Sequence, residues 1–397
     1  MIGRRGKERW AREAVHGPVD ARLTGLVFLL LGFGLVMVYS ASSVLSMIQF
    51  GTSTAFFTGQ ATKAVLGVLA MLLVARIDYR IWRPLAKPLV WVSIGLLLLL
   101  AFPVAPSLTP EVNGARRWVA LPGFSFQPLE LAKLALVLWL AVTLSRKSEK
   151  LDRFSEGVAP LMALPLAMAG LLLFQPDFKG AGLLVLLAWL MLFLGGVKAR
   201  YLAGMAAVGI PATLAVLVLE PYRLRRLAAW FDRGEDLSGI SYQINQSLIS
   251  LGSGGWFGVG LGSSKQKFAF LPAAHNDFIF SIIGEELGVL GTLFVLAAFL
   301  WFGWIGYRIA RRAPDAFGFL LASGITTLVL IAALVNIGVA TAVLPTTGLT
   351  LPFISYGGTS LVIQLVAVGI LMSVSRDAVE EPPGRWAARA SGAPQRR

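Results

Sequence analysis

Long apolar segments recur along most of this 397-residue chain, and they constrain its fold more than any other feature. A hydrocarbon layer about 30 Å thick is crossed by roughly 20 apolar residues in a helix. Ten segments have a suitable length and composition, and they cover residues 23–45, 59–75, 85–105, 128–144, 157–174, 180–196, 201–219, 277–306, 316–344 and 354–374. We therefore predict an all-α polytopic membrane protein with ten transmembrane helices.

Basic residues predict the orientation, because positively charged short loops are retained in the cytoplasm. Most of the 35 Lys and Arg residues fall on one side of the membrane if both termini are cytoplasmic. The predicted domains are a cytoplasmic arm over 1–22, a transmembrane domain over 23–375 and a disordered cytoplasmic tail over 376–397. The net charge of +14 then follows from topology, and it does not indicate a nucleic-acid partner.

The seventh and eighth predicted helices are joined by a long extracytoplasmic loop over 220–276. A loop of this length in a compact membrane protein is usually functional. Residues 221–231 mix arginine with leucine and aromatic side chains, which is typical of a helix in the membrane interface, whether functional or a plain anchor. Residues 252–262 are glycine-rich, and they form either a segment that turns sharply or approaches a ligand, or a flexible loop.

Asp277 is the strongest functional candidate, because an ionised side chain at the mouth of a membrane helix is costly to place. The alternative is that its carboxylate caps the helix. Glu285 and Glu286 follow deeper in the same helix, where the alternative to function is a buried hydrogen bond or ion pair with another helix. Glu130 and Lys133 form either a structural pair on one helix face or a functional group whose lysine reaches the outward cavity.

The chain has no cysteine, and its two histidines are His16 and His275. Thiolate sites and a multi-histidine metal centre are therefore excluded, and we identify no metal site. Cations at the predicted outer face are more prominent. They are Arg116, Arg117, Lys179 beside Asp177, Arg223, Arg225, Arg226, Arg233, Lys265 and Lys267.

Five segments form an ordered set of motifs within residues 20–375. They are GLVMVYSASS at 34–43, GARRWVALPGFSFQPLELAKLAL at 114–136, QPDFKG at 175–180, SYQINQSLISLGSGGWFGVGLGSSKQKFAFLPAAHNDFIFSIIGEELG at 241–288, and LPTTGLTLPFISYGGTSL at 344–361. Together they resemble the SEDS family of bacterial cell-wall polymerases, the shape, elongation, division and sporulation proteins. The first segment is most similar to the FtsW, division-type branch, and the RodA and SpoVE branches are the alternatives.

The resemblance implies ten transmembrane helices and a peptidoglycan glycosyltransferase of the bacterial cytoplasmic membrane. Its substrate would be lipid II, a disaccharide-pentapeptide on undecaprenyl diphosphate, polymerised into β-1,4-linked glycan at the outer face during cell division. The essential acidic residue of the family falls on Asp277, and its Arg-Arg-Trp loop falls on Arg116, Arg117 and Trp118. The implied partners are a class B penicillin-binding protein, which would supply crosslinking, and other membrane proteins of the division complex.

The chain departs from the family pattern at several positions. Ala273 stands where relatives usually have Glu, Asn276 where they have Thr or Ser, and Thr347 where they often have Lys. Phe178 and Lys179 replace the usual Leu-Gly. The change at Thr347 removes a potential phosphate ligand.

An α-linked donor that yields a β-linked glycan implies inversion, so one general base suffices, and we expect Asp277 to be that base. The donor diphosphate needs charge neutralisation, for which a divalent cation, Mg²⁺ or Mn²⁺, is one candidate. The candidate side chains for this contact are Arg116, Arg117, Lys265, Lys267 and Lys133. Trp118, Gln246 and His275 are further substrate-binding candidates, and Glu130, Glu285 and Glu286 are secondary ones.

Two functions from other classes are alternatives. A flippase for lipid-linked precursors needs a continuous polar path between leaflets, whereas few polar groups lie deep in the predicted helices, mainly Glu285, Glu286 and Asn336. A scaffold that recruits division proteins would not need an outward cavity with a carboxylate and cations. Within the family, a RodA-type elongation polymerase is the alternative.

Overall fold

The computed structural model describes residues 17–102, 107–111, 114–121, 124–146, 151–218, 230, 240–268 and 270–377. Most of the predicted N-terminal arm, the interfacial segment 221–231 apart from Trp230, and the tail beyond residue 377 lie outside the described residues. The cationic candidates Arg223, Arg225, Arg226 and Arg233 lie outside them as well.

The described chain is almost entirely helical. Its long helices are α2 (Ala21–Phe50), α3 (Ala55–Arg76), α4 (Trp82–Ala101), α5 (Pro128–Arg146), α6 (Ala159–Phe174), α7 (Phe178–Leu194), α8 (Ala199–Val218), α10 (Ile240–Ser253), α11 (Ile279–Arg312), α12 (Ala316–Ala340) and α13 (Thr359–Arg376). Short helical turns precede two of them, η1 (Tyr79–Ile81) before α4 and the π-helical η3 (Phe154–Val158) before α6. The strands are β1 (Val119–Leu121) and β2 (Phe124–Phe126).

Nine helical segments of the described residues are long and apolar enough to cross a membrane, and α7, with 17 residues, is a shorter apolar helix. This confirms a polytopic helical membrane protein with nine to ten candidate spans. The sequence did not predict the antiparallel pair of β1 and β2, in which Val119 lies opposite Phe126, because strands of three residues contain too little pattern. It also did not predict α10 within the long loop.

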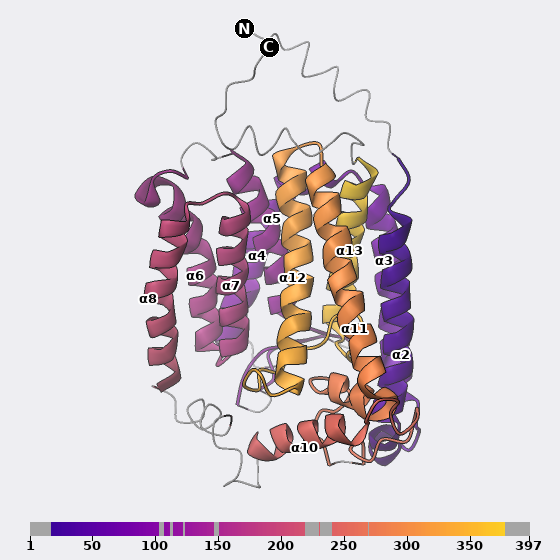
Figure 1. Ribbon diagram of the computed structural model, residues 1–397. Coiled ribbons are helices and arrows are strands. Elements are labelled where there is room, and N and C mark those ends of the chain that lie inside the picture. Colours follow the sequence, from indigo (N-terminus) through magenta and orange to yellow (C-terminus); the bar gives the residue numbers. More distant parts are fainter. Residues whose placement is uncertain are drawn as a thin grey trace.

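The membrane-type helices stand side by side in a bundle, and α10 lies across one end of it (Figure 1). The start of α2 and the end of α13 meet at the opposite end. There the Gly17 N–H donates to the Arg376 carbonyl oxygen at 2.9 Å, and the Asp20 N–H donates to Ser375 Oγ at 3.1 Å. We call these two ends of the bundle the α10 end and the terminal end.

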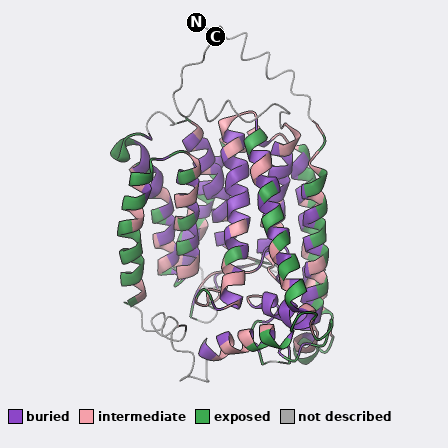
Figure 2. Ribbon diagram, in the orientation of Figure 1, coloured by how far each residue is buried: buried purple, intermediate pink, exposed green. Residues whose placement is uncertain are grey.

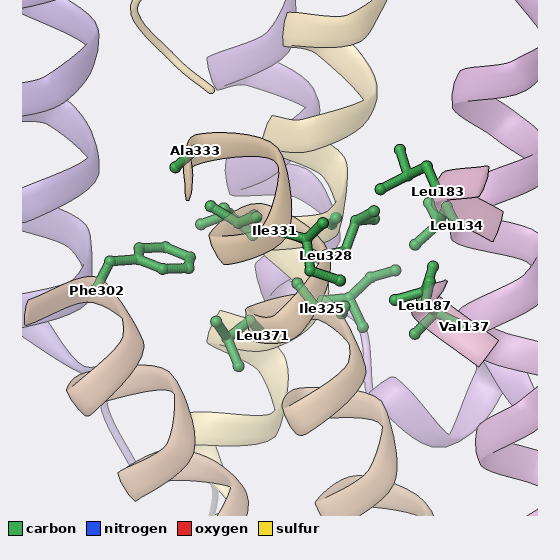
Figure 3. Packing of buried hydrophobic residues seen from close by; sticks show 14 of the residues in the cluster. Leu134, Val137, Leu183, Leu187, Phe302, Ile325, Leu328, Ile331, Ala333 and Leu371 are labelled. Carbon is green, nitrogen blue, oxygen red and sulfur yellow. The ribbon is translucent and has the colours of Figure 1, made fainter. Parts of the chain in front are cut away.

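Helices α5 and α12 lie at the centre of the bundle, while α8 lies at its edge. In the apolar stretches of α5 and α12, 78% of the residues are buried, against 6% in α8, which is exposed along most of its length (Figure 2). In the core, Leu134 and Val137 of α5, Leu187 of α7, and Ile325 and Leu328 of α12 gather in one cluster (Figure 3). Apolar side chains on the outer helices are expected in a protein whose surface contacts lipid.

Helix α11 is broken at Gly288, which corrects the prediction of a continuous helix over 277–306. Gly288 has φ 67° and ψ −162°, so the helical hydrogen bonds are interrupted there. The glycine-rich loop after α10 replaces them. Val259 N–H donates to the Glu285 carbonyl oxygen at 2.9 Å and Val289 N–H donates to the Gly255 carbonyl oxygen at 2.9 Å. The break is tolerated because protein, not lipid, satisfies the freed backbone groups.

The apolar segment predicted to span 354–374 also begins later than expected. Helix α13 starts at Thr359, and residues 341–358 form an irregular segment between α12 and α13. Gly357 and Gly358 directly precede the helix, and Gly358 has φ 51°, a conformation outside the helical region. The irregular segment is therefore available to form part of a site at the α10 end.

The loop after α10 requires glycine where it approaches α11. A β carbon at Gly254 would lie 1.9 Å from the Gly284 carbonyl oxygen, whereas one at Gly252 would meet nothing within 4 Å. We expect Gly254→Ala to destabilise the protein by about 1–3 kcal/mol through overpacking, and Gly252→Ala to be neutral or slightly stabilising. Thermal unfolding of both variants in detergent measures the difference. Equal melting temperatures would contradict the close approach.

Candidate active site

Asp277 lies at the α10 end of the bundle, in the turn that leads into α11. The N-cap residue of α11 is Phe278, with no side-chain cap, so Asp277 does not occupy the capping position that the sequence allowed. Its backbone is held by Asn336 of α12, whose Nδ2 donates to the carbonyl oxygens of Asp277 at 2.9 Å and Leu349 at 2.7 Å. A buried amide of the core thus ties the Asp277 turn to the irregular segment 341–358.

Further hydrogen bonds join the same two segments. Ser355 Oγ donates to the Asn276 carbonyl oxygen at 2.6 Å, and the Tyr356 N–H donates to the His275 carbonyl oxygen at 3.0 Å. Gln60 of α3 is buried and donates to the Ser355 carbonyl oxygen at 3.0 Å. The backbone that carries Asp277 is therefore positioned by α12 directly and by α3 through the irregular segment, while the Asp277 side chain is half-buried.

Lys179, in the first turn of α7, reaches the same place. Its Nζ donates a hydrogen bond to the Gly348 carbonyl oxygen. A β carbon at Gly348 would lie 3.1 Å from Asp277 Oδ2 and 3.1 Å from Lys179 Nζ. A carboxylate and an ammonium therefore flank one point beside the irregular segment. The sequence placed Lys179 on the outer face but did not assign it to the site.

Arg117 contacts the residues at the start of α7. Its guanidinium donates to the Pro176 carbonyl oxygen at 2.7 Å, and its Nε lies 3.9 Å from Asp177 Oδ1. Asp177 is the N-cap of α7 and accepts from the Gly180 N–H at 3.2 Å. Arg117 thus contacts the turn that presents Lys179.

Arg116 lies in a small polar hollow beside this turn. It is 3.4 Å from Glu111, and a cavity of about 170 Å³ is lined by these two residues with Gln175 and Phe174 among others. Trp118 is half-buried next in the chain, and Gln246 is half-buried on α10.

Glu285 and Glu286 belong to a buried network that holds the glycine-rich loop against α11. Ser40 of α2 donates to Glu286 Oε2 at 2.6 Å, and Ser264 donates to Glu285 Oε2 at 2.6 Å. Lys267 Nζ donates to the Gly262 carbonyl oxygen and lies 3.8 Å from Glu286. The interhelical hydrogen bonds that the sequence offered as the alternative for these glutamates are therefore present.

Of the two lysines of this loop, Lys265 has an exposed side chain and Lys267 a buried one, and their contact with a diphosphate stays a prediction. The Lys267 side chain is buried among the network, and the Lys265 N–H donates to Glu285 Oε1 at 2.8 Å. Glu130 and Lys133 of α5 form a second buried pair at 2.7 Å, with Ser360 donating to Glu130 Oε2 at 3.1 Å. These contacts support structural roles for both acid–base pairs.

His275 lies two residues before Asp277 and packs against aromatic rings. Its ring is buried, with its centroid 4.7 Å from that of Phe56 and 5.7 Å from that of Tyr356. Burial lowers the pKa of His275 to about 4. The imidazole is therefore neutral at pH 7, and it contributes shape and packing instead of positive charge.

Metal ligation has little support in the described part of the chain. Its His, Asp and Glu side chains form no group of three or more that could hold a metal ion. The charged side chain placed beside Asp277 is that of Lys179 on α7, and Arg117 contacts the turn at the start of the same helix.

A helical membrane bundle with a half-buried carboxylate and an ammonium at one end has an arrangement suited to a membrane-embedded enzyme. Residues 21–380 match the sequence model of the FtsW/RodA/SpoVE family, described as cell cycle protein. The chain belongs to this SEDS family. It is a multi-pass protein of the bacterial cytoplasmic membrane and a peptidoglycan glycosyltransferase similar to FtsW.

Individual relatives agree over most of the chain. A "Probable peptidoglycan glycosyltransferase FtsW" of Geobacter metallireducens is 46% identical over 343 residues, covering 86% of this chain and 91% of the relative. Stage V sporulation protein E of Bacillus subtilis is 39% identical over 357 residues, covering 90% and 97%. The predicted family is thereby confirmed.

Solved structures show the same fold. A chain from a study of the structural coordination of polymerization and crosslinking by a peptidoglycan synthase complex aligns with a TM-score of 0.74 at 30% identity, covering 91% of this chain and 99% of that one. The rod shape determining protein RodA of Thermus thermophilus aligns with a TM-score of 0.67 at 29% identity, covering 91% and 98%.

Removal of Glu286 tests the buried network. Glu286→Ala removes the buried acceptor of the Ser40 hydroxyl and the Ser264 N–H and the carboxylate near the Lys267 ammonium, so we expect a loss of about 3–5 kcal/mol in stability. Glu156→Ala is the control, because Glu156 pairs at the surface with Arg153, and such pairs contribute at most about 1 kcal/mol. Thermal unfolding in detergent compares them, and equal losses would refute the network as an anchor.

His275 predicts a pH dependence of stability. The folded protein binds fewer protons at this site than the unfolded chain, whose histidine has a pKa near 6.5. Stability should therefore fall as the pH drops from about 6.5 towards 4, by on the order of 1 kcal/mol per pH unit. His275→Gln should flatten this dependence. A melting-temperature profile with the same slope in both proteins would contradict the neutral imidazole.

Proposed function

We propose that this protein polymerises lipid II into β-1,4-linked glycan at the outer face of the membrane during cell division, with Asp277 as the general base. The observation that supports it best is the placement of Asp277. Its backbone is held by Asn336, while its half-buried carboxylate and the Lys179 ammonium border the same point beside Gly348.

The charge distribution supports an outward-facing site. Basic side chains at the terminal end join the chain ends to the helices. Arg80 contacts Asp377 at 2.6 Å, and Arg308 pairs with Asp20. If this basic end is cytoplasmic, both described termini are inside and Asp277 faces the outer leaflet. Ten spans satisfy this arrangement, with α7 as the short one.

The proposed reaction is an inverting displacement. The acceptor sugar hydroxyl attacks the anomeric carbon of the donor and forms the new C–O bond, while Asp277 accepts the hydroxyl proton. The bond from the anomeric carbon to the diphosphate oxygen breaks, and the diphosphate leaves with the electron pair. Cationic side chains such as Arg116 and Arg117 neutralise the donor as it binds. No step requires a covalent intermediate.

A flippase is less well supported by the same contacts. Such a protein needs polar groups that form a path through the bundle, yet the deep charged groups are engaged with one another or with serines. Glu130 pairs with Lys133, and Glu286 binds Ser40 and lies near Lys267. These closed networks favour a bundle that stays sealed around a site at one end.

A crosslinking partner is also part of the proposal. The similar solved chain belongs to a complex that couples polymerization to crosslinking. We propose that a class B penicillin-binding protein supplies crosslinking for the present chain, together with other membrane proteins of the division complex.

Asp277→Asn tests the assignment of the base. Asparagine preserves the shape of the side chain but cannot accept the proton, so we expect glycan synthesis from labelled lipid II to fall at least about a hundredfold. The assay uses purified protein with its penicillin-binding partner and reads glycan ladders on a gel. Glu156→Gln, at an exposed glutamate away from the site, should retain full activity.

The outcomes separate the alternatives. Ladders from both wild type and Asp277→Asn would keep the polymerase but remove Asp277 as its base. No ladder from wild type, combined with movement of lipid II between leaflets of reconstituted vesicles, would replace the polymerase by a flippase. Neither activity, with loss of partner recruitment as the sole defect of a deletion strain, would favour a scaffold.

A further inference from the structure

Lys179 is an unusual residue for the start of a helix. It lies in the first turn of α7, directly after the N-cap region, where a positive charge is unfavourable beside the free amides of the helix. Asp177 offsets part of this cost, but Asp177 also lies near Arg117. Local helix stability therefore does not explain a lysine at this position.

The side chain of Lys179 extends to the irregular segment 341–358. Its hydrogen bond to the Gly348 carbonyl oxygen fixes the ammonium in place and uses one of its three donors. Gly348 has φ 72°, a conformation that favours glycine. A side chain at this residue would occupy the point that Lys179 and Asp277 flank, so glycine keeps that point accessible to both.

The spacing suits two groups that act on one displacement. Asp277 Oδ2 and Lys179 Nζ are each 3.1 Å from the same point, so their separation is at most about twice that distance. In an inverting transfer, the base binds the attacking hydroxyl and a cation binds the leaving group on the other side of the anomeric carbon. With hydrogen bonds of about 3 Å, Asp277 can bind the attacking hydroxyl oxygen while Lys179 binds the leaving diphosphate oxygen.

The residues that precede Gly348 and Asp277 in the chain carry unpaired polar atoms. Within the described residues, Thr347 Oγ1 and Asn276 Oδ1 are buried without a hydrogen-bond partner. Thr347 precedes Gly348, and Asn276 precedes Asp277. A polar ligand between the two segments would satisfy hydrogen-bonding groups that are costly to leave unpaired.

We propose that Lys179 is a further catalytic residue, which contacts the leaving diphosphate of the lipid-linked donor. This inference rests on the proposed function, because the donor is the substrate of that reaction. As the bond between the anomeric carbon and the diphosphate oxygen breaks, the ammonium stabilises the charge that develops on the diphosphate. It transfers no proton. Asp277 takes the proton of the acceptor, so the two residues divide the reaction.

The structure also connects two departures from the family pattern. These are the lysine at 179 and the threonine at 347, where the sequence departs from the pattern expected from the resemblance. Because Lys179 binds the backbone of the residue after Thr347, the two positions are neighbours in space. Lys179 thus delivers from α7 the positive charge that a lysine at position 347 would deliver from the irregular segment.

Ligand binding tests the contact independently of turnover. We would measure binding of undecaprenyl diphosphate and of uncharged undecaprenol to detergent-purified wild type and Lys179→Met. Loss of a charge-assisted contact should weaken diphosphate binding about tenfold or more and leave undecaprenol binding unchanged. Lys198→Met is the matched control, because Lys198 pairs with Asp152 at the exposed surface of the terminal end. Equal weakening of both ligands, or of neither, would overturn the proposal.

Turnover with lipid II provides the second test. Lys179→Met should lower kcat about tenfold to a hundredfold at an unchanged melting temperature, and Lys179→Arg should restore part of it. The double variant Lys179→Met with Thr347→Lys should recover activity, because its ammonium returns to the same point. If Lys179→Met and the wild type are equally active, the proposed role of Lys179 is refuted, while the proposed function of the protein stands. An inactive wild type would refute the proposed function, and the binding measurement would still decide on the diphosphate contact.

Discussion

Backbone polar groups in an apolar layer must be satisfied inside the protein, and the break of α11 at Gly288 is where this fold meets that constraint most directly. The glycine-rich loop supplies the missing hydrogen bonds, and its glycines allow the two backbones to touch. Glu285 and Glu286 then bind the far part of the same loop through Ser264 and its neighbours. Loop and helix stabilise each other, and the half of α11 at the α10 end gains a fixed position directly after Asp277.

The candidate site depends on this rigidity. Asp277 is placed by Asn336 of α12 and by the irregular segment 341–358, while Lys179 comes from α7 and Arg117 from the loop before β1. Catalytic groups need supporting contacts that hold them to within a fraction of an ångström. The buried pair of Glu130 and Lys133 plays a different part, because its groups satisfy each other within the core. Charged residues that look alike in the sequence therefore divide into those that pair within the bundle and those that lie at the candidate site.

Much of this organisation could be predicted from residue patterns. Apolar segments of about 20 residues gave the helices because a membrane span requires that length, and the motif around Asp277 indicated the family. For Glu286, the sequence left buried hydrogen bonds as one alternative to a functional role, because no residue pattern shows which helix lies opposite this side chain. Lys267 was expected to bind an anionic ligand, because its charge is visible in the sequence but its burial beside Glu286 is not. For Lys179 the sequence indicates only a cation on the predicted outer face.

By itself, then, the sequence determined a polytopic helical membrane protein of the SEDS family, with Asp277 as its leading functional candidate. Apolar length and local motifs are properties of neighbouring residues, so they can be recognised without coordinates. Only the tertiary structure decided that α11 is broken at Gly288 and that Lys179 meets Asp277 beside Gly348. The meeting residues are far apart in the chain, and their proximity depends on how α7, α11 and the irregular segment 341–358 pack, which no local pattern encodes.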